Sequence, residues 1–168
     1  MTELEMIEKN PLNILLIENP SEDVQLAAVQ LDGISIKYIN NPSKEIQLAA
    51  VQEDGHSIKH IKNPDTEIQL AAVEENGNAI KYIKNPSIEI QLVAVKEDGF
   101  SIEYITNPSE DVQIAAIQRR EYAIGCIINP SKEIQLFAVK RKLDVIDLIR
   151  EPHPEVLEYV KQELLKKL

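Results

Sequence analysis

Apolar and polar positions along this chain recur with a fixed period of 22 residues. Asn-Pro pairs begin at residues 19, 41, 63, 85, 107 and 129, and one further step reaches Glu151-Pro152. The first full unit reads NPSEDVQLAAVQLDGISIKYIN, and the later units keep its apolar positions. A fixed period of this size is typical of a solenoid, in which each unit packs on its neighbours.

Each unit predicts two helices, with positions counted from the Asn of its Asn-Pro pair. The first helix is expected from the Pro to about position 13, with the Asn as its cap and an acid near its positive end. The Asp-Gly or Asn-Gly pair at positions 14 and 15 predicts a left-handed stop or a tight turn. The isoleucines at positions 18 and 21 then fit one face of a shorter helix. A segment such as ISIKYI also alternates as a strand would, but a helix pair buries both isoleucines together.

The predicted fold class is therefore all-α, an α-solenoid of short, HEAT-like helix-turn-helix repeats with a right-handed superhelix. Residues 1–168 are expected to form one domain. Residues 1–18 fit an N-terminal capping half-repeat, residues 19–150 six full repeats, and residues 151–168 a C-terminal capping helix. Repeat arrays need such atypical ends to cover their exposed faces.

A glutamine stands at position 7 of every unit, inside an otherwise apolar run. On a helix this position falls between apolar neighbours, so we expect a largely buried amide that must find hydrogen-bond partners. The partners would be backbone groups of the Asn-Pro linkers or the equivalent glutamine one unit on, which would form a ladder. We interpret the row as structural rather than catalytic. Its members are Gln25, Gln47, Gln69, Gln91, Gln113 and Gln135.

The small residues at positions 9 and 10, which are mostly alanines, predict close approach of neighbouring helices. Val93 and Phe137 replace the first alanine in two units, where the neighbouring unit would have to yield space. Position 20 carries Tyr38, His60, Tyr82 or Tyr104 in four units. A half-buried packing row is favoured there over a recognition stripe.

Composition and charge narrow the class of protein. The net charge of −10 opposes nonspecific binding of the whole molecule to nucleic acid or to an anionic membrane. A single cysteine, an N-terminus without the regions of a signal peptide and the absence of a long aliphatic run favour a cytoplasmic protein outside the membrane.

Candidates for chemistry are few, and we predict no enzyme activity, no metal and no cofactor. His56 and His60 are four residues apart, a spacing that can hold a metal on a helix, but no third ligand is evident. Surface histidines are the favoured interpretation. Cys126 has no histidine near it in sequence to act as a base, and the chain has no Gly-rich phosphate loop.

Charge along the turn between the two helices of each unit indicates an interaction surface. Positions 12 to 14 are acidic in the early units and basic in the last two. Repeat proteins often bind through the positions that vary between matched units. The alternative is ordinary variation in solvated turns. The candidate partner-binding residues on this edge are Arg119, Arg120, Tyr122, Lys140, Arg141 and Lys142, and the variable position 16 adds His56 and Phe100.

The segments QLAAVQEDGHSIKHI and QLAAVEENGNAIKYI resemble a family of helical repeats of unknown function found in bacterial, phage and giant-virus proteins. The resemblance covers about residues 19–150. It implies a helical repeat fold and no particular activity. The phage association implies a protein that engages a host factor, with inhibition of that factor as one form of engagement.

Three functions remain open from the sequence. The favoured one is a non-enzymatic scaffold that binds a protein partner. The alternative is binding of nucleic acid or an acidic ligand at the C-terminal basic edge, or mimicry of phosphates by the acids at position 5. The third is self-association into a homo-oligomer through an incomplete cap.

Overall fold

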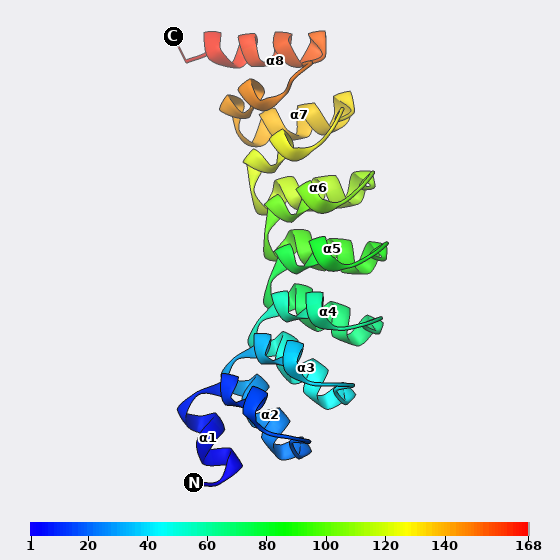
Figure 1. The fold of residues 1–168 in the computed structure, drawn as a ribbon. Helices are drawn as coiled ribbons and strands as arrows, with labels where there is room; N and C mark the ends of the chain where they lie inside the picture. The colour runs from blue at the N-terminus through cyan, green and yellow to red at the C-terminus, as the bar shows by residue number, and fades with distance from the viewer. Residues whose placement is uncertain (168) are drawn as a thin grey trace.

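The structure is a computed structural model that describes residues 1–167, and within them the chain is entirely helical apart from turns and linkers. Figure 1 shows the helices stacked in one row, with the two termini at opposite ends. Each full repeat pairs one α-helix with one 3₁₀ helix. The α-helices are α1 (Glu3–Lys9), α2 (Glu22–Leu31), α3 (Lys44–Glu53), α4 (Thr66–Glu75), α5 (Ile88–Glu97), α6 (Glu110–Arg119), α7 (Lys132–Arg141) and α8 (Pro154–Leu165). The 3₁₀ helices are η1 (Pro11–Leu16), η2 (Gly33–Tyr38), η3 (Gly55–His60), η4 (Gly77–Tyr82), η5 (Gly99–Tyr104), η6 (Glu121–Cys126) and η7 (Leu143–Leu148).

The all-α solenoid predicted from the 22-residue period is confirmed. Neighbouring α-helices pack on each other in chain order, and neighbouring 3₁₀ helices do the same. The strand alternative for the second half of the unit is wrong, since residues 1–167 contain no strand. A pair of helices satisfies its backbone within each repeat, so the repeats need only apolar contacts to stack.

The start of each full repeat differs from the prediction. The Asn of the Asn-Pro pair does not cap the α-helix but lies in the left-handed region, with φ between 51° and 55° in all six repeats. The residue before a proline avoids the α region, and asparagine tolerates the left-handed one. The cap is the next residue after the proline. In α2 this is Ser21, whose hydroxyl accepts from the backbone N–H of Val24 at 3.4 Å.

The turn between the two helices also differs from the prediction. None of the glycines within residues 1–167 has a positive φ, so the left-handed stop, one of the two alternatives given by the sequence, is wrong. Asp32 instead caps η2, accepting from the N–H of Ile34 at 3.0 Å. The glycine that follows is required by the next repeat, because a Cβ on Gly33 would lie 2.4 Å from the carbonyl oxygen of Ala50.

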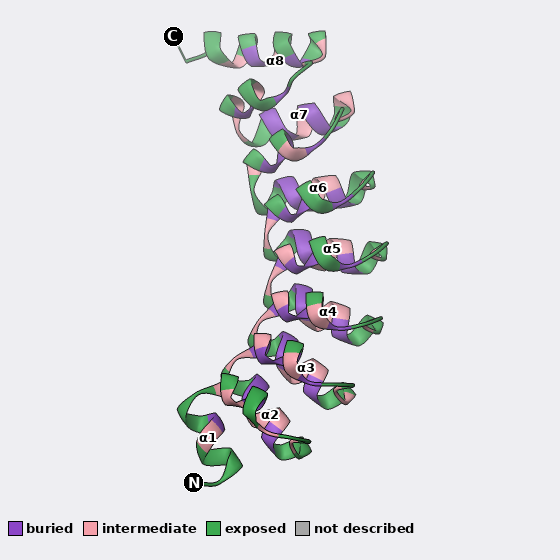
Figure 2. Cartoon of the chain, in the orientation of Figure 1, coloured by how far each residue is buried: buried purple, intermediate pink, exposed green. Residues whose placement is uncertain are grey.

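One core runs along the stack, formed by positions 6, 10, 11, 18 and 21 of the repeats. In repeat 1 (residues 19–40) these are Val24, Ala28, Val29, Ile36 and Ile39. Figure 2 shows buried residues within every layer and exposed residues at the outer tips of the layers. The alanine at position 10 is fully buried at 0% exposure, whereas position 9 is mostly half-buried.

Larger side chains replace the first alanine at position 9 in two repeats. Val93 and Phe137 were predicted to need space from the neighbouring repeat. Both side chains are half-buried against the edge of the core, and Phe137 lies beneath the guanidinium of Arg141, with 5.8 Å between the guanidinium carbon and the ring centroid. Repeat 6 (residues 129–150), which carries Phe137, is also the repeat that packs less closely on the one before it.

The stack is less tight between repeat 5 (residues 107–128) and repeat 6 (residues 129–150) than elsewhere. Here α6 and α7 pack less closely than α2 to α6 do with one another. Repeat 5 has Glu121 where repeats 1 to 4 have glycine. A Cβ at those glycines would lie 2.4 to 2.6 Å from the carbonyl oxygen of the next repeat. Glu121 carries that Cβ, so repeat 6 cannot approach repeat 5 as closely.

Candidate partner-binding surfaces

The basic edge predicted from the sequence exists, but much of its charge is paired within the chain. Arg120 forms an ion pair with Asp98 of the preceding repeat, with 3.2 Å between Nε and Oδ1. Arg141 pairs with Glu121, with 3.1 Å between Nη2 and Oε1. A hydrogen bond within Glu121 itself, from its own backbone N–H, and the Arg141 guanidinium lower the pKa of the Glu121 carboxyl. These contacts join neighbouring repeats.

The aromatic residues of this edge are covered by the same cations. Lys142 lies over the ring of Tyr122, with 4.4 Å from Nζ to the ring centroid, and the Tyr122 hydroxyl donates to Asp144 at 3.0 Å. Contact with Tyr122 raises the pKa of Lys142. Arg120 lies over Phe100 at 5.5 Å. The edge is therefore a network between repeats, in which Arg120, Arg141 and Lys142 each contact another side chain of the protein.

Arg119, Lys140 and Lys142 are the three edge cations that form no ion pair within residues 1–167. The Nε of Arg119 donates to the carbonyl oxygen of Glu97 at 3.2 Å. Lys140 lies 5.8 Å from the ring centroid of Tyr159 on α8. The side chains of Arg119 and Lys140 are exposed.

The two histidines considered for a metal lie on the same 3₁₀ helix but in different surroundings. His56 has its Nδ1 3.4 Å from Asp54 and its ring at right angles to that of Tyr82 in the next repeat, with 5.8 Å between centroids. Burial lowers the pKa of His60, and Lys59 and Lys37 lower it further. Within residues 1–167 no three His, Cys, Asp or Glu side chains are grouped so that they could hold a metal ion.

The glutamines at position 7 tie each α-helix to its own linker. In every repeat the Nε2 group donates to the carbonyl oxygen of the Asn-Pro proline, at 2.8 to 3.0 Å. This is the linker alternative given by the sequence. The ladder from one glutamine to the next does not form within residues 1–167. The side-chain amide of each glutamine binds the proline carbonyl oxygen of its own repeat instead. Only Gln135 is buried, at 5% exposure, and the other five are half-buried.

The 3₁₀ helices gather most of the aromatic side chains on one surface. We call the side chains at positions 16, 19, 20 and 22 the 3₁₀ face. Of the seven Phe and Tyr residues in the chain, five lie on it: Tyr38, Tyr82, Phe100, Tyr104 and Tyr122. Four of these five are between 36% and 43% exposed. The rows at positions 16 and 20 were both identified from the sequence, and packing was the favoured interpretation for position 20.

Lysines flank these rings in the first three repeats, a feature that the sequence analysis missed. They stand at positions 19 and 22 of the repeat, all are exposed, and none forms an ion pair within residues 1–167. We call them the lysine strip: Lys37, Lys59, Lys62, Lys81 and Lys84. Position 19 then changes to Glu103, Gly125 and Asp147 in repeats 4 to 6. The sequence of the repeats contains this signal, because the charge at position 19 is positive in repeats 1 to 3 and is lost or negative in repeats 4 to 6.

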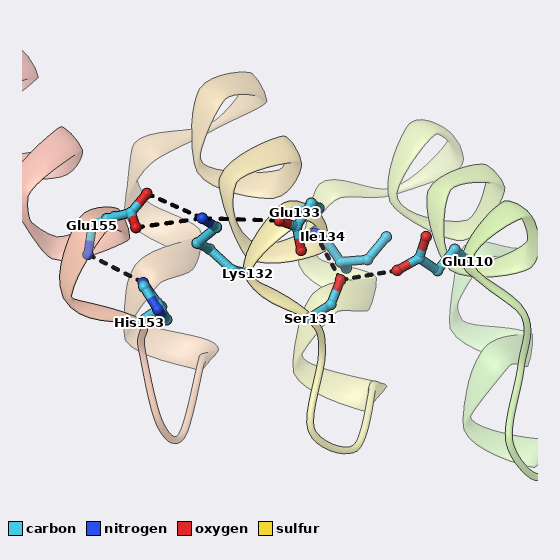
Figure 3. A network of polar contacts seen from close by, with 7 residues as sticks. All are labelled: Glu110, Ser131, Lys132, Glu133, Ile134, His153 and Glu155. Atoms are coloured by element: carbon cyan, nitrogen blue, oxygen red, sulfur yellow. Dashed lines mark hydrogen bonds and ion pairs between the residues drawn. The ribbon is translucent and has the colours of Figure 1, made fainter.

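A polar network joins the last full repeat to α8, as Figure 3 shows. Lys132 Nζ lies 3.2 Å from Glu155 and 4.0 Å from Glu133. His153 Nδ1 accepts from the backbone N–H of Glu155 at 3.3 Å and so caps α8. These side chains belong to the packing of the C-terminal helix.

A hollow of about 570 Å³ opens beside the looser joint between repeats 5 and 6. Gly125, Cys126 and Leu148 line it on the 3₁₀ side, and Gln135 lines it from α7. Cys126 and Leu148 stand at position 20, where repeats 1 to 4 carry tyrosine or histidine. Burial raises the pKa of the Cys126 thiol, and Glu103 and Asp98 raise it further. The thiol therefore stays protonated and unreactive at neutral pH.

Comparison with known proteins gives one match. Residues 43–88 match the model of a family described as Domain of unknown function (DUF4116). The DUF4116 segment spans α3, η3, α4 and η4, so it contains four lysines of the strip together with His60 and Tyr82. No curated protein and no solved structure matches the chain significantly. None of the helices within residues 1–167 is long and apolar enough to cross a membrane.

Proposed function

We propose that this chain is a non-enzymatic repeat scaffold that binds a protein partner through its 3₁₀ face. The observation that supports the proposal is the concentration of half-exposed aromatic rings on that face, in a chain with only 4% aromatic residues. Aromatic side chains are enriched in the cores and hot spots of protein interfaces. A fold that needed them for stability would bury them.

The size of the face suits such a partner. Stacked helices lie about 8–10 Å apart, so the rings from Tyr38 to Tyr122 extend over roughly 40 Å. Covering the exposed parts of four rings would remove on the order of 300 Å² of largely apolar surface from water, or roughly 7 kcal/mol before the costs of association. That gross energy is enough for a specific complex.

Binding of nucleic acid at the C-terminal basic edge is the second candidate. Arg119 and Lys140 favour it, because neither has a carboxylate partner within residues 1–167. The pairing of Arg120 and Arg141, and the net charge of −10, oppose it. Engagement of a host factor, suggested by the resemblance to phage repeats alone, would be one form of the favoured proposal.

The test compares capture of protein from lysate of the source cells, with and without nuclease treatment. The immobilised chain is used as wild type, as the Tyr82→Ser/Tyr104→Ser variant, and as a Leu31→Ser/Leu157→Ser control that removes exposed apolar side chains elsewhere. We expect a defined protein to be retained by wild type and control and lost with the tyrosine variant. Retention that disappears only with nuclease, or that all three share, would contradict the proposal.

A further inference from the structure

The lysine strip is a surface of the described chain where five exposed lysines gather and none has a carboxylate partner. The chain carries 28 acidic residues against 18 basic ones, so an unpaired group of five lysines stands out against its background. Acids at position 5 of the repeats are carried by the α-helices, whereas the lysines follow the 3₁₀ helices. In repeats 1 to 3 the acids at position 5 and the lysines of the strip therefore lie on different parts of the repeat.

The pKa of His60 responds to the positive charges on this surface. It stands beside Lys59 and shares its row with Tyr38 and Tyr82. Part of the lowering of its pKa comes from Lys59 of its own repeat and Lys37 of the preceding one. Charges of two successive repeats thus act on one ring, as expected if the lysines form a continuous strip and not isolated points.

We propose that the lysine strip binds an extended acidic segment of the protein partner, with its carboxylates paired to lysines and its backbone laid along the tyrosines. This inference rests on the proposed function and names the chemistry of the partner. The strip presents a lysine pair in repeats 2 and 3 and a single lysine in repeat 1. The change of position 19 to Glu103 marks its far end.

The spacing of the repeats sets the spacing of the partner's acids. Neighbouring repeats lie about 8–10 Å apart, and an extended peptide rises about 3.3 Å per residue. Successive repeats therefore meet every third residue or so of a peptide that runs along the stack. The matching motif is an acid at roughly every third position over about 9 residues.

The rings of this surface favour carboxylates over nucleic acid. Single-stranded nucleic acid binds by stacking bases on free aromatic faces beside basic groups. Here Lys37 lies 4.5 Å from the ring centroid of Tyr38, and Lys81 lies 4.9 Å from that of Tyr82 and 5.9 Å from that of Tyr104. One face of each ring is thus occupied by an ammonium group. The net charge of −10 also repels a phosphate polymer more strongly than a short acidic peptide.

The test measures binding of defined probes to the full chain by fluorescence anisotropy at low salt. The probes are a labelled peptide of about 20 residues with glutamate at every third position, the same peptide with glutamine instead, and oligothymidylate of similar length. The variant is Lys59→Glu/Lys62→Glu/Lys81→Glu. The control, Lys9→Glu/Lys96→Glu/Lys161→Glu, changes the net charge equally at exposed lysines elsewhere. Circular dichroism and thermal melting verify that both fold.

We expect the glutamate peptide to bind wild type and the control, and affinity to fall at least about tenfold in the strip variant. Bound peptide should also raise the pKa of His60, followed by NMR, because its carboxylates offset Lys59 and Lys37. Failure of the glutamate peptide to bind, equal losses in both variants, or tighter binding of oligothymidylate would each overturn the inference.

The inference and the proposed function can fail separately. If the strip variant still captures from lysate a protein whose retention requires Tyr82 and Tyr104, the proposed function stands and the acidic segment is rejected. If the glutamate peptide binds through the strip but no protein depends on the tyrosines, the strip is an anion site and the proposed partner surface is rejected.

Discussion

The glutamine at position 7 shows how one residue type can serve a repeat without entering its core. Its amide reaches back five residues to the proline carbonyl, next to the left-handed asparagine, and so fixes the bend where one repeat leads into the next. Gln135 does more, because it also donates to the carbonyl oxygen of Glu151 at 3.3 Å and accepts from the N–H of His153 at 2.8 Å. It connects the last full repeat to the cap.

Replacement of this glutamine should therefore depend on the repeat. We expect Gln69→Ala to lower the free energy of unfolding by about 1 kcal/mol, the value of one half-exposed hydrogen bond. Gln135→Ala should lower it by about 2–3 kcal/mol, because buried partners are left unsatisfied. Urea unfolding of both variants measures the difference. Equal effects would show that burial of Gln135 contributes nothing.

At the scale of the element, each repeat uses two caps and one left-handed residue. A Ser or Asp starts the α-helix, an Asp or Asn at position 14 starts the 3₁₀ helix in repeats 1 to 4, and an Asn turns the linker. Six residues of 3₁₀ helix are long for that geometry, which is tolerated because positions 18 and 21 are held by the core.

The linker asparagine gives a clean test of this description. Asn63 is exposed and has a φ of 51°. Asn63→Ala should destabilise the chain by about 1–2 kcal/mol, because a Cβ without a local hydrogen bond is unfavourable in the left-handed region. Asn63→Gly should fold with nearly wild-type stability. Thermal melting of the two variants measures the difference in stability. An alanine variant as stable as the wild type would contradict the left-handed conformation assigned to Asn63.

At the scale of the whole molecule, the distance between repeats is set by backbone contact at position 15. The turn glycine of repeats 1 to 4 lies against the carbonyl oxygen of position 10 in the next repeat, and Glu121 breaks this contact before repeat 6. The molecule is therefore a tight array of repeats 1 to 5 with a looser C-terminal part. The lysine strip lies on the tight part, where the spacing is regular.

A glycine pair tests this account of the spacing. In Gly77→Ala the new Cβ would lie 2.4 Å from the carbonyl oxygen of Ala94, so we expect a loss of about 1–3 kcal/mol of unfolding free energy. In Gly125→Ala the nearest atoms belong to the Leu148 side chain, at 3.4 Å or more, and little change is expected. Denaturant melts measure both. Similar losses of unfolding free energy in the two variants would show that this backbone contact does not set the distance between repeats.

Much of the fold could be predicted from residues, because the period and the apolar positions repeat without a shift. Ile36 and Ile39 were correctly placed on one buried face, and the paired helices followed from them. The roles of Asn19 and Gly33 were not predicted correctly. Asparagine before proline and glycine after aspartate each have several local conformations, and contacts with the next repeat select among them.

The surfaces were harder to predict, because exposure depends on neighbouring repeats. Arg120 and Arg141 look like free cations in the sequence, but the acids that pair with them stand 20 or more residues earlier. Tyr82 and Tyr104 look like a packing row, yet 3₁₀ geometry leaves each about two-fifths exposed.

The sequence by itself determined that this protein is a linear array of helical pairs, because a strict period of apolar positions can be buried in only one regular way. The tertiary structure alone decided which charges are free. Stacking brings residues about 22 positions apart into contact, and this pairs Arg120 and Arg141 of the C-terminal basic edge with carboxylates, while it leaves the lysines of the first three repeats unpaired beside exposed tyrosines.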